Sequence, residues 1–82
     1  MFMYYVYILL SIKDKSKYVG YSSYSPEKRL VEHNQGMNKY TKAHRPYELV
    51  WFCAFTDKSK AESFEKYLKH GSGFAFANKR FI

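Results

Sequence analysis

The stretch that most limits the fold is residues 3–11 (MYYVYILLS), a nearly continuous apolar run rich in Tyr and β-branched side chains. Such a run is typical of a strand that is buried on both faces, and it therefore predicts the central strand of a sheet. Because side chains alternate along a strand, the run divides into two faces. Tyr5, Tyr7 and Leu9 are expected on one face, and Val6, Ile8 and Leu10 on the other.

A second strand is predicted immediately after the first. Residues 12–16 (IKDKS) form a polar turn, and residues 17–21 (KYVGY) are again apolar and aromatic. The two strands should therefore pair as an antiparallel hairpin. Gly20 lies inside the second strand, where a glycine indicates a bend or a close approach to the backbone.

The first helix has a clear beginning at Ser25-Pro26-Glu27. Ser suits the N-cap, Pro the first helical position, and an acid the first turn. The helix is predicted to continue to about Asn34, with Gly36 as its stop. Arg29 and His33 are four residues apart, so they share one face of this helix. A solvated face is the simplest interpretation of that pair.

The rest of the chain supplies a loop, a strand and another helix. Residues 37–46 are polar and basic, and residues 47–55 (YELVWFCAF) are predicted to form a third strand. Either Asp57 or Ser59 caps the next helix, and the segment from Ser59 to Glu62 matches a capping box. The apolar face of this helix is predicted to contain Ala61, Phe64, Tyr67 and Leu68, and the helix to end at Gly71.

The order β-β-α-β-α predicts an α+β fold in which a three-stranded antiparallel sheet is flanked by helices. The pattern leaves room for a short C-terminal helix over residues 74–80. A chain of 82 residues has space for one core, so we expect a single domain over residues 1–82.

The charge is strongly basic, with 14 Lys and Arg against 7 Asp and Glu. Such a domain is attracted to polyanions, of which nucleic acid is the usual one, although a merely soluble surface has the same composition. The single cysteine, Cys53, excludes an intrachain disulfide and fits a cytoplasmic protein with a buried thiol. The apolar start is too short to span a bilayer, so no membrane is expected as a partner.

Among the acids, Glu65 is the most informative. It falls at the edge of the apolar face of the second helix, where a carboxylate needs a cation or a metal nearby. On position alone, an ordinary pair with Lys69, one turn later, is the favoured interpretation. The loop side chains Lys39, Tyr40, Lys42 and Arg45 could hold phosphates and stack on a base.

In this order the segments resemble the GIY-YIG nuclease superfamily, and in particular its small stand-alone members. Tyr5-Val6-Tyr7 and Tyr18-Val19-Gly20 resemble the paired motif of the family, with Tyr5 in place of its first glycine. Residues 27–34 are similar to its R-x-x-x-H helix, residues 40–50 to its loop and third strand, and residues 58–69 to the helix with the metal-binding acid. The resemblance covers about residues 3–80 and implies the same fold.

The resemblance also implies roles. Tyr7 would be the general base, with a pKa lowered by nearby cations from its ordinary value of about 10, and Tyr18 would face the same phosphate. Arg29 would stabilise charge on the phosphate, and His33 would relay a proton or bind phosphate. Glu65 would hold one Mg²⁺ or Mn²⁺ ion, which stabilises the leaving 3′ oxygen. The tail residue Asn78 is a candidate for the active-site asparagine of the family.

The expected function is therefore a metal-dependent endonuclease that acts on DNA in repair or recombination. RNA is not excluded as the substrate, and a protein partner could supply targeting. The main alternative is a nucleic-acid-binding module without catalysis on the same fold.

Overall fold

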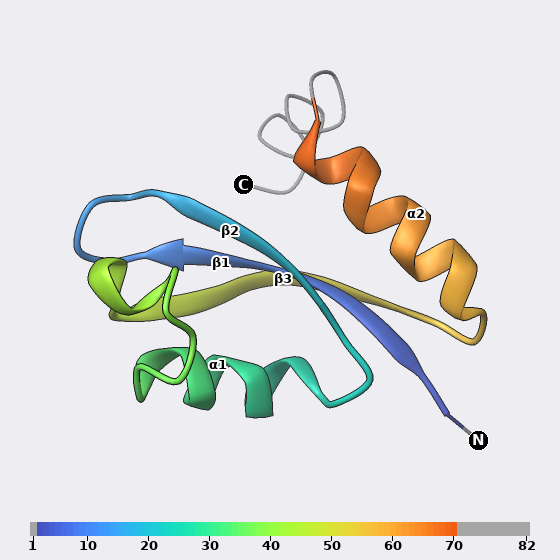
Figure 1. Cartoon of the computed structure of the whole chain (residues 1–82), viewed down its shortest axis with the longest axis horizontal. Helices are drawn as coiled ribbons and strands as arrows, with labels where there is room; N and C mark the ends of the chain where they lie inside the picture. The colour runs from blue at the N-terminus through green and yellow to red at the C-terminus, as the bar shows by residue number, and fades with distance from the viewer. Residues whose placement is uncertain (1, 71–82) are drawn as a thin grey trace.

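The computed structural model describes residues 2–70, and within them the predicted order β-β-α-β-α is confirmed. The expected helix over 74–80, the stop at Gly71 and the candidate Asn78 lie outside the described residues. The elements, shown in Figure 1, are β1 (Tyr4–Ser11), β2 (Lys17–Ser22), α1 (Pro26–Asn34), a short 3₁₀ turn η1 (Lys42–His44), β3 (Tyr47–Phe55) and α2 (Lys58–Lys69).

The sheet has the order β2-β1-β3, and both pairings are antiparallel. The prediction that residues 3–11 form the central strand is confirmed, because β1 has a partner on each side. In the register, Tyr7 lies opposite Gly20 of β2 and Phe52 of β3. A register shift between Ile8 and Leu9 marks an irregularity in the β1–β3 pairing. Strands β2 and β3 are therefore the edge strands of the sheet.

The two helices cover opposite faces of the sheet (Figure 1). On one face, Val6 and Ile8 are fully buried against Ala61 and Leu68 of α2. On the other face, Tyr7 and Leu9 are buried with Tyr47, and Leu30 of α1 packs against them. The alternation predicted for the buried part of β1 is therefore confirmed, and each face is covered by a different helix.

Helix α1 begins and ends as predicted. The Ser25 side chain accepts a hydrogen bond from the Lys28 backbone N–H, and Pro26 occupies the first helical position. After the helix, Gly36 has a φ of +81°, a left-handed conformation that costs a glycine little. This turn directs the loop back toward the sheet.

Helix α2 begins at Asp57, whose side chain accepts a hydrogen bond from the Lys60 backbone N–H. The predicted capping box at Ser59 is therefore wrong. Asp57 already satisfies an N–H of the first turn, which places Ser59 inside the helix. The predicted apolar face holds at Ala61 and Leu68, which are buried.

The rest of that face is less buried. Phe64 is only partly buried, and Tyr67 is exposed with its ring stacked on Phe64 at a centroid distance of 6.0 Å. The Cys53 thiol is half-buried, and burial raises its pKa, as expected of a structural thiol. Within residues 2–70, no helix combines the length and the apolar character that crossing a membrane requires.

Candidate active site

Side chains from three elements meet on the α1 face of the sheet. The Tyr7 hydroxyl of β1 lies 3.1 Å from Nε2 of His33 on α1. Nε of Arg29, one turn earlier on α1, donates to the same hydroxyl at 3.5 Å. The Tyr18 ring of β2 lies 4.9 Å from the His33 ring, centroid to centroid. The structure thus brings together Tyr7, Tyr18, Arg29 and His33, as the sequence predicted.

Gly20 makes room for this group of side chains. It lies opposite Tyr7 in the sheet, and a Cβ at this position would come within 2.2 Å of Tyr7 Cζ. No real side chain contact is that short, so any residue other than glycine would displace the Tyr7 ring. The predicted close approach at Gly20 is confirmed, and its partner is the aromatic ring that carries the central hydroxyl of the site.

Tyr7 is fully buried, and burial governs its chemistry. Loss of solvent raises the pKa of the Tyr7 phenol, while the hydrogen bond and positive charge of Arg29 act in the opposite direction and are outweighed. The expectation that nearby cations lower this pKa is therefore wrong in this structure, because one guanidinium does not offset the cost of burying a phenolate. Tyr7 is a neutral hydrogen-bonding phenol at neutral pH.

His33 is buried too and lies between two hydroxyl groups. Its Nε2 faces Tyr7, and its Nδ1 lies 2.7 Å from Oγ1 of Thr41. Burial lowers the pKa of His33, the charge of Arg29 lowers it further, and Glu32 opposes both. The imidazole is therefore neutral at neutral pH. Sequence reasoning missed Thr41, because nothing in a polar loop marks the one hydroxyl that turns inward.

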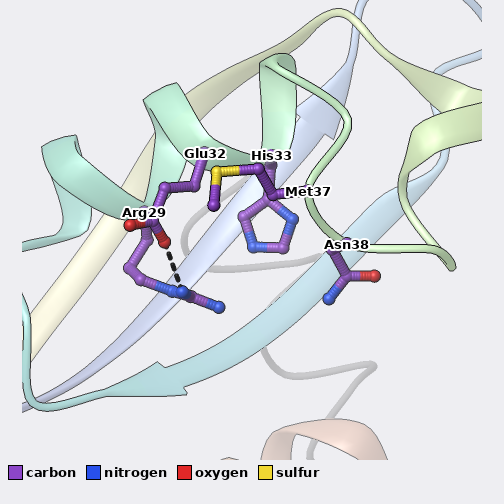
Figure 2. A pocket seen from close by; sticks show the side chains of 5 residues that line it. All are labelled: Arg29, Glu32, His33, Met37 and Asn38. Carbon is purple, nitrogen blue, oxygen red and sulfur yellow. Dashed lines mark hydrogen bonds and ion pairs between the residues drawn. The ribbon is translucent and has the colours of Figure 1, made fainter.

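A small pocket opens beside Arg29 and His33 (Figure 2). Its volume is about 160 Å³, and Figure 2 shows the Arg29 guanidinium and the His33 ring pointing from α1 toward the same side. Arg29 also forms an ion pair with Glu32, with 2.5 Å between Nη1 and Oε1. The hydrogen bond to Tyr7 is the main cause that raises the pKa of Arg29, so the guanidinium stays charged. Met37 and Asn38 complete the lining.

Glu65 comes from the opposite side of the sheet. Its carboxylate is mostly buried and accepts from Nζ of Lys69 at 3.0 Å, so the helical pair considered from the sequence is formed. The same Lys69 ammonium lies 5.9 Å from the centre of the Tyr18 ring, at the β2 edge. The charge of Glu65 also contributes to raising the Tyr7 pKa. This contribution is the smallest of those that act on the Tyr7 pKa, and the described contact of the Glu65 carboxylate is the one with Lys69.

The residues present fit one kind of metal site. Within residues 2–70, no three side chains of the His, Cys, Asp or Glu types gather closely enough to hold an ion. These residues therefore do not form a closed zinc site, which needs four such ligands. Mg²⁺ commonly takes one or two carboxylates and completes its shell with water and substrate phosphate. Glu65 suits such a shared site.

The basic loop, residues 37–46, lies next to the group formed by Tyr7, Tyr18, Arg29 and His33, but its side chains are spread out. Tyr40 is 70% exposed, and its ring centroid lies 6.0 Å from that of Tyr18. Arg45 lies over Gly36 with Lys42, and its Nη1 donates to the Asn34 carbonyl at 3.5 Å. A wider pocket of about 510 Å³ follows the β2 edge beside Tyr40. Its lining residues are Lys17, Tyr18, Val19, Tyr40 and Lys69.

These loop positions leave the predicted binding residues in two groups. Tyr40 borders the site through Tyr18, whereas Lys42 and Arg45 lie beyond the end of α1. Lys39 is exposed in the same loop. The loop therefore places the Tyr40 ring near Tyr18 and the charges of Lys42 and Arg45 farther from the site.

Comparison with known proteins identifies a family that the chain matches. Residues 3–79 match the family model of the GIY-YIG catalytic domain. A UPF0213 protein of Clostridium perfringens is 46% identical over 68 residues, which span 82% of this chain and 71% of that protein. The UPF0213 protein YazA of Bacillus subtilis is 39% identical over 64 residues, spanning 77% of this chain and 64% of YazA.

One solved structure is similar along nearly the whole chain. The solution NMR structure of a UPF0213 protein from Bacillus halodurans superposes with a TM-score of 0.57 and 32% sequence identity. The match covers 96% of this chain and 86% of that one.

Proposed function

The chain belongs to the GIY-YIG family, and from this premise we propose that it is a divalent-metal-dependent endonuclease that hydrolyses phosphodiester bonds in DNA, in repair or recombination. The observation that carries the proposal is the contact between the Tyr7 hydroxyl, His33 Nε2 and Arg29 Nε beside an open pocket. The excess of basic residues favours a polyanionic substrate.

Arg29 would bind the phosphate. In the free protein its guanidinium is shared between Glu32 and the Tyr7 hydroxyl. A phosphate oxygen offers a stronger, charge-assisted acceptor than a phenol does. Substrate would therefore draw Arg29 away from Tyr7, and this movement would open the buried phenol to water. Arg29 would then stabilise the charge that develops on the phosphate during attack.

Tyr7 and His33 would handle the proton of the attacking water. The phenol oxygen accepts a proton from the water while the phenol proton passes to Nε2 of His33, 3.1 Å away. The nucleophile becomes hydroxide, Tyr7 ends neutral, and His33 ends as imidazolium. Because burial lowers the pKa of His33, the imidazolium readily gives up its proton afterwards. This route avoids a free phenolate, which the burial of Tyr7 disfavours.

Glu65 would hold the metal ion together with water and the substrate phosphate. When bound, the ion supplies charge stabilisation at the leaving oxygen. The chain's contribution is a carboxylate placed at the β2 edge, with Lys69 as its partner in the free protein. That ion pair is partly exposed, so the cost of exchanging it for a metal is small.

The test replaces Glu65 while keeping its shape. Glu65→Gln should lower the cleavage rate by about 100-fold or more, because a metal contributes several kcal/mol to the transition state. Binding of the same DNA in chelator should change little. Glu62→Gln, an exposed glutamate of the same helix, is the matched control and should cut at the parent rate. Equal cutting by Glu65→Gln and the parent would remove Glu65 from the mechanism.

The complete burial of Tyr7 favours a second candidate function, a nucleic-acid-binding module that does not cut. A module of this kind would bind DNA with the same dependence on salt, because phosphate contacts by basic residues set that dependence. It would leave every substrate intact in Mg²⁺ and in Mn²⁺. Cleavage that is lost in Glu65→Gln distinguishes the two functions.

A further inference from the structure

We propose that Thr41 is a positioning residue, which holds His33 in the tautomer protonated at Nδ1 and so leaves Nε2 as the acceptor for the Tyr7 proton. This inference rests on the proposed function, since it assigns how the proton relay is set. Thr41 touches neither the pocket wall nor the Tyr7 hydroxyl, and it would act only through His33.

With His33 protonated at Nδ1, the hydrogen bonds from Tyr7 through His33 and Thr41 to Asn38 form a continuous chain, and each bond has its own donor proton. In the tautomer protonated at Nδ1, the Tyr7 hydroxyl would donate to His33 Nε2, 3.1 Å away, and His33 Nδ1–H would donate to Thr41 Oγ1, 2.7 Å away. The Thr41 hydroxyl in turn donates to the Asn38 carbonyl over 3.5 Å. Thr41 is fully buried, so no water competes for its hydroxyl.

The opposite tautomer leaves a proton without a partner. With the proton on Nε2, His33 would donate to the Tyr7 hydroxyl, which already receives the N–H of Arg29. The phenol's own proton would then have no acceptor among the contacts of the described residues. An unsatisfied buried donor is costly. The arrangement with Nδ1 protonated avoids that cost.

The loop before Thr41 is built to fix its position. The Asn38 side-chain oxygen accepts the backbone N–H of Tyr40 at 2.8 Å and that of Thr41 at 3.2 Å. The Asn38 carbonyl also accepts the Lys42 N–H at 3.0 Å. These bonds close a turn that directs the Thr41 hydroxyl inward. Because the Asn38 carbonyl takes the proton of the Thr41 hydroxyl, the hydroxyl oxygen is left to accept from Nδ1–H of His33.

The remaining groups around His33 do not set its tautomer. Arg29 and Glu32 act on its charge from α1, and their effects on its pKa are opposite in sign. Three phenol rings pack around it from the three strands, and of these only the Tyr7 ring bonds to the imidazole through its hydroxyl. The rings are those of Tyr7, Tyr18 and Tyr47.

The decisive measurement is ¹⁵N NMR of the imidazole nitrogens in the full chain, without metal or nucleic acid. We expect the His33 signals of the parent at neutral pH to show a protonated Nδ1 and an unprotonated Nε2. In Thr41→Val, which keeps the shape and removes the hydroxyl, the tautomers should become mixed. Thr41→Ser should restore the parent pattern, and Thr56→Val, at the exposed threonine after β3, should not alter it.

Cleavage supplies the second readout. Thr41→Val should lower kcat about 10-fold with KM unchanged, the size expected from one lost hydrogen bond, and should shift the acidic limb of the pH profile. Thr41→Ser should recover both. A parent spectrum with the proton on Nε2, or an unchanged spectrum in Thr41→Val, would overturn the inference. The spectra decide this even for a chain that cuts nothing, so failure of the nuclease proposal is separately visible.

Discussion

At the scale of single residues, the site depends on how Tyr7 is buried. The phenol lies under Arg29, against His33 and over Gly20, with no exposed surface. Burial raises the Tyr7 pKa more than the guanidinium lowers it. The hydroxyl is consequently neutral at neutral pH, and it lies 3.1 Å from Nε2 of His33. The position of the Tyr7 ring in turn depends on the absence of a side chain at Gly20.

Gly20→Ala tests that dependence. The added methyl group would overlap the buried Tyr7 ring, so the ring must move or the strands must separate. We expect the free energy of unfolding to fall by about 1–3 kcal/mol, the usual cost of overpacking. Cleavage should fall by much more than this loss of stability explains.

Urea unfolding and cleavage rates measured on the same preparation give both numbers. Ser23→Ala, at an exposed position just after β2, is the control and should resemble the parent in both. A Gly20→Ala protein with parent stability and parent activity would show that the Tyr7 ring does not need its place over Gly20.

The family resemblance marked the site residues that lie on regular elements, whereas the residue pattern alone favoured a solvated face for Arg29 and His33, and the burial of His33 contradicts that interpretation. Tyr7 and Tyr18 come from a hairpin of fixed register, and Arg29 and His33 share a helix face by their spacing. Thr41 was missed, because its inward orientation depends on a turn around Asn38 that no periodic pattern describes.

At the scale of secondary structure, the strands and helices follow the local signals closely. The bounds of α1 and β3 agree with the prediction, because Ser25-Pro26 and a long apolar run are unambiguous. The sequence allows α2 to be capped by either Asp57 or Ser59, since both residue types cap helices well. The structure places the cap at Asp57, which receives the Lys60 N–H.

A pair of alanine substitutions tests this cap. Asp57→Ala should lower the free energy of unfolding by about 1 kcal/mol, because an N–H of the first turn loses its acceptor. Ser59→Ala, an exposed position inside the helix, should change it by less than about 0.5 kcal/mol. Thermal or urea unfolding of both variants measures the difference. A larger loss in Ser59→Ala than in Asp57→Ala would return the cap to Ser59.

At the scale of the whole molecule, the candidate site residues approach the β2 edge from both sides of the sheet. Helix α1 brings Arg29 and His33 on one face, and α2 brings Glu65 on the other. The sequence predicted an α+β sheet with two buried faces, but periodicity alone does not say which helix covers which face. That Glu65 and Tyr7 belong to different faces of the sheet could therefore be found only from the packed structure.

The claim that these groups cut a nucleic-acid backbone is tested most directly by cleavage itself. The full chain would be incubated with end-labelled branched, flap and plain duplex DNA, in Mg²⁺, in Mn²⁺ and in EDTA. We expect cutting of at least one substrate with either metal, none with EDTA, and a steep loss of DNA binding as salt rises. Intact DNA in every lane, or cutting that persists in EDTA, would contradict it.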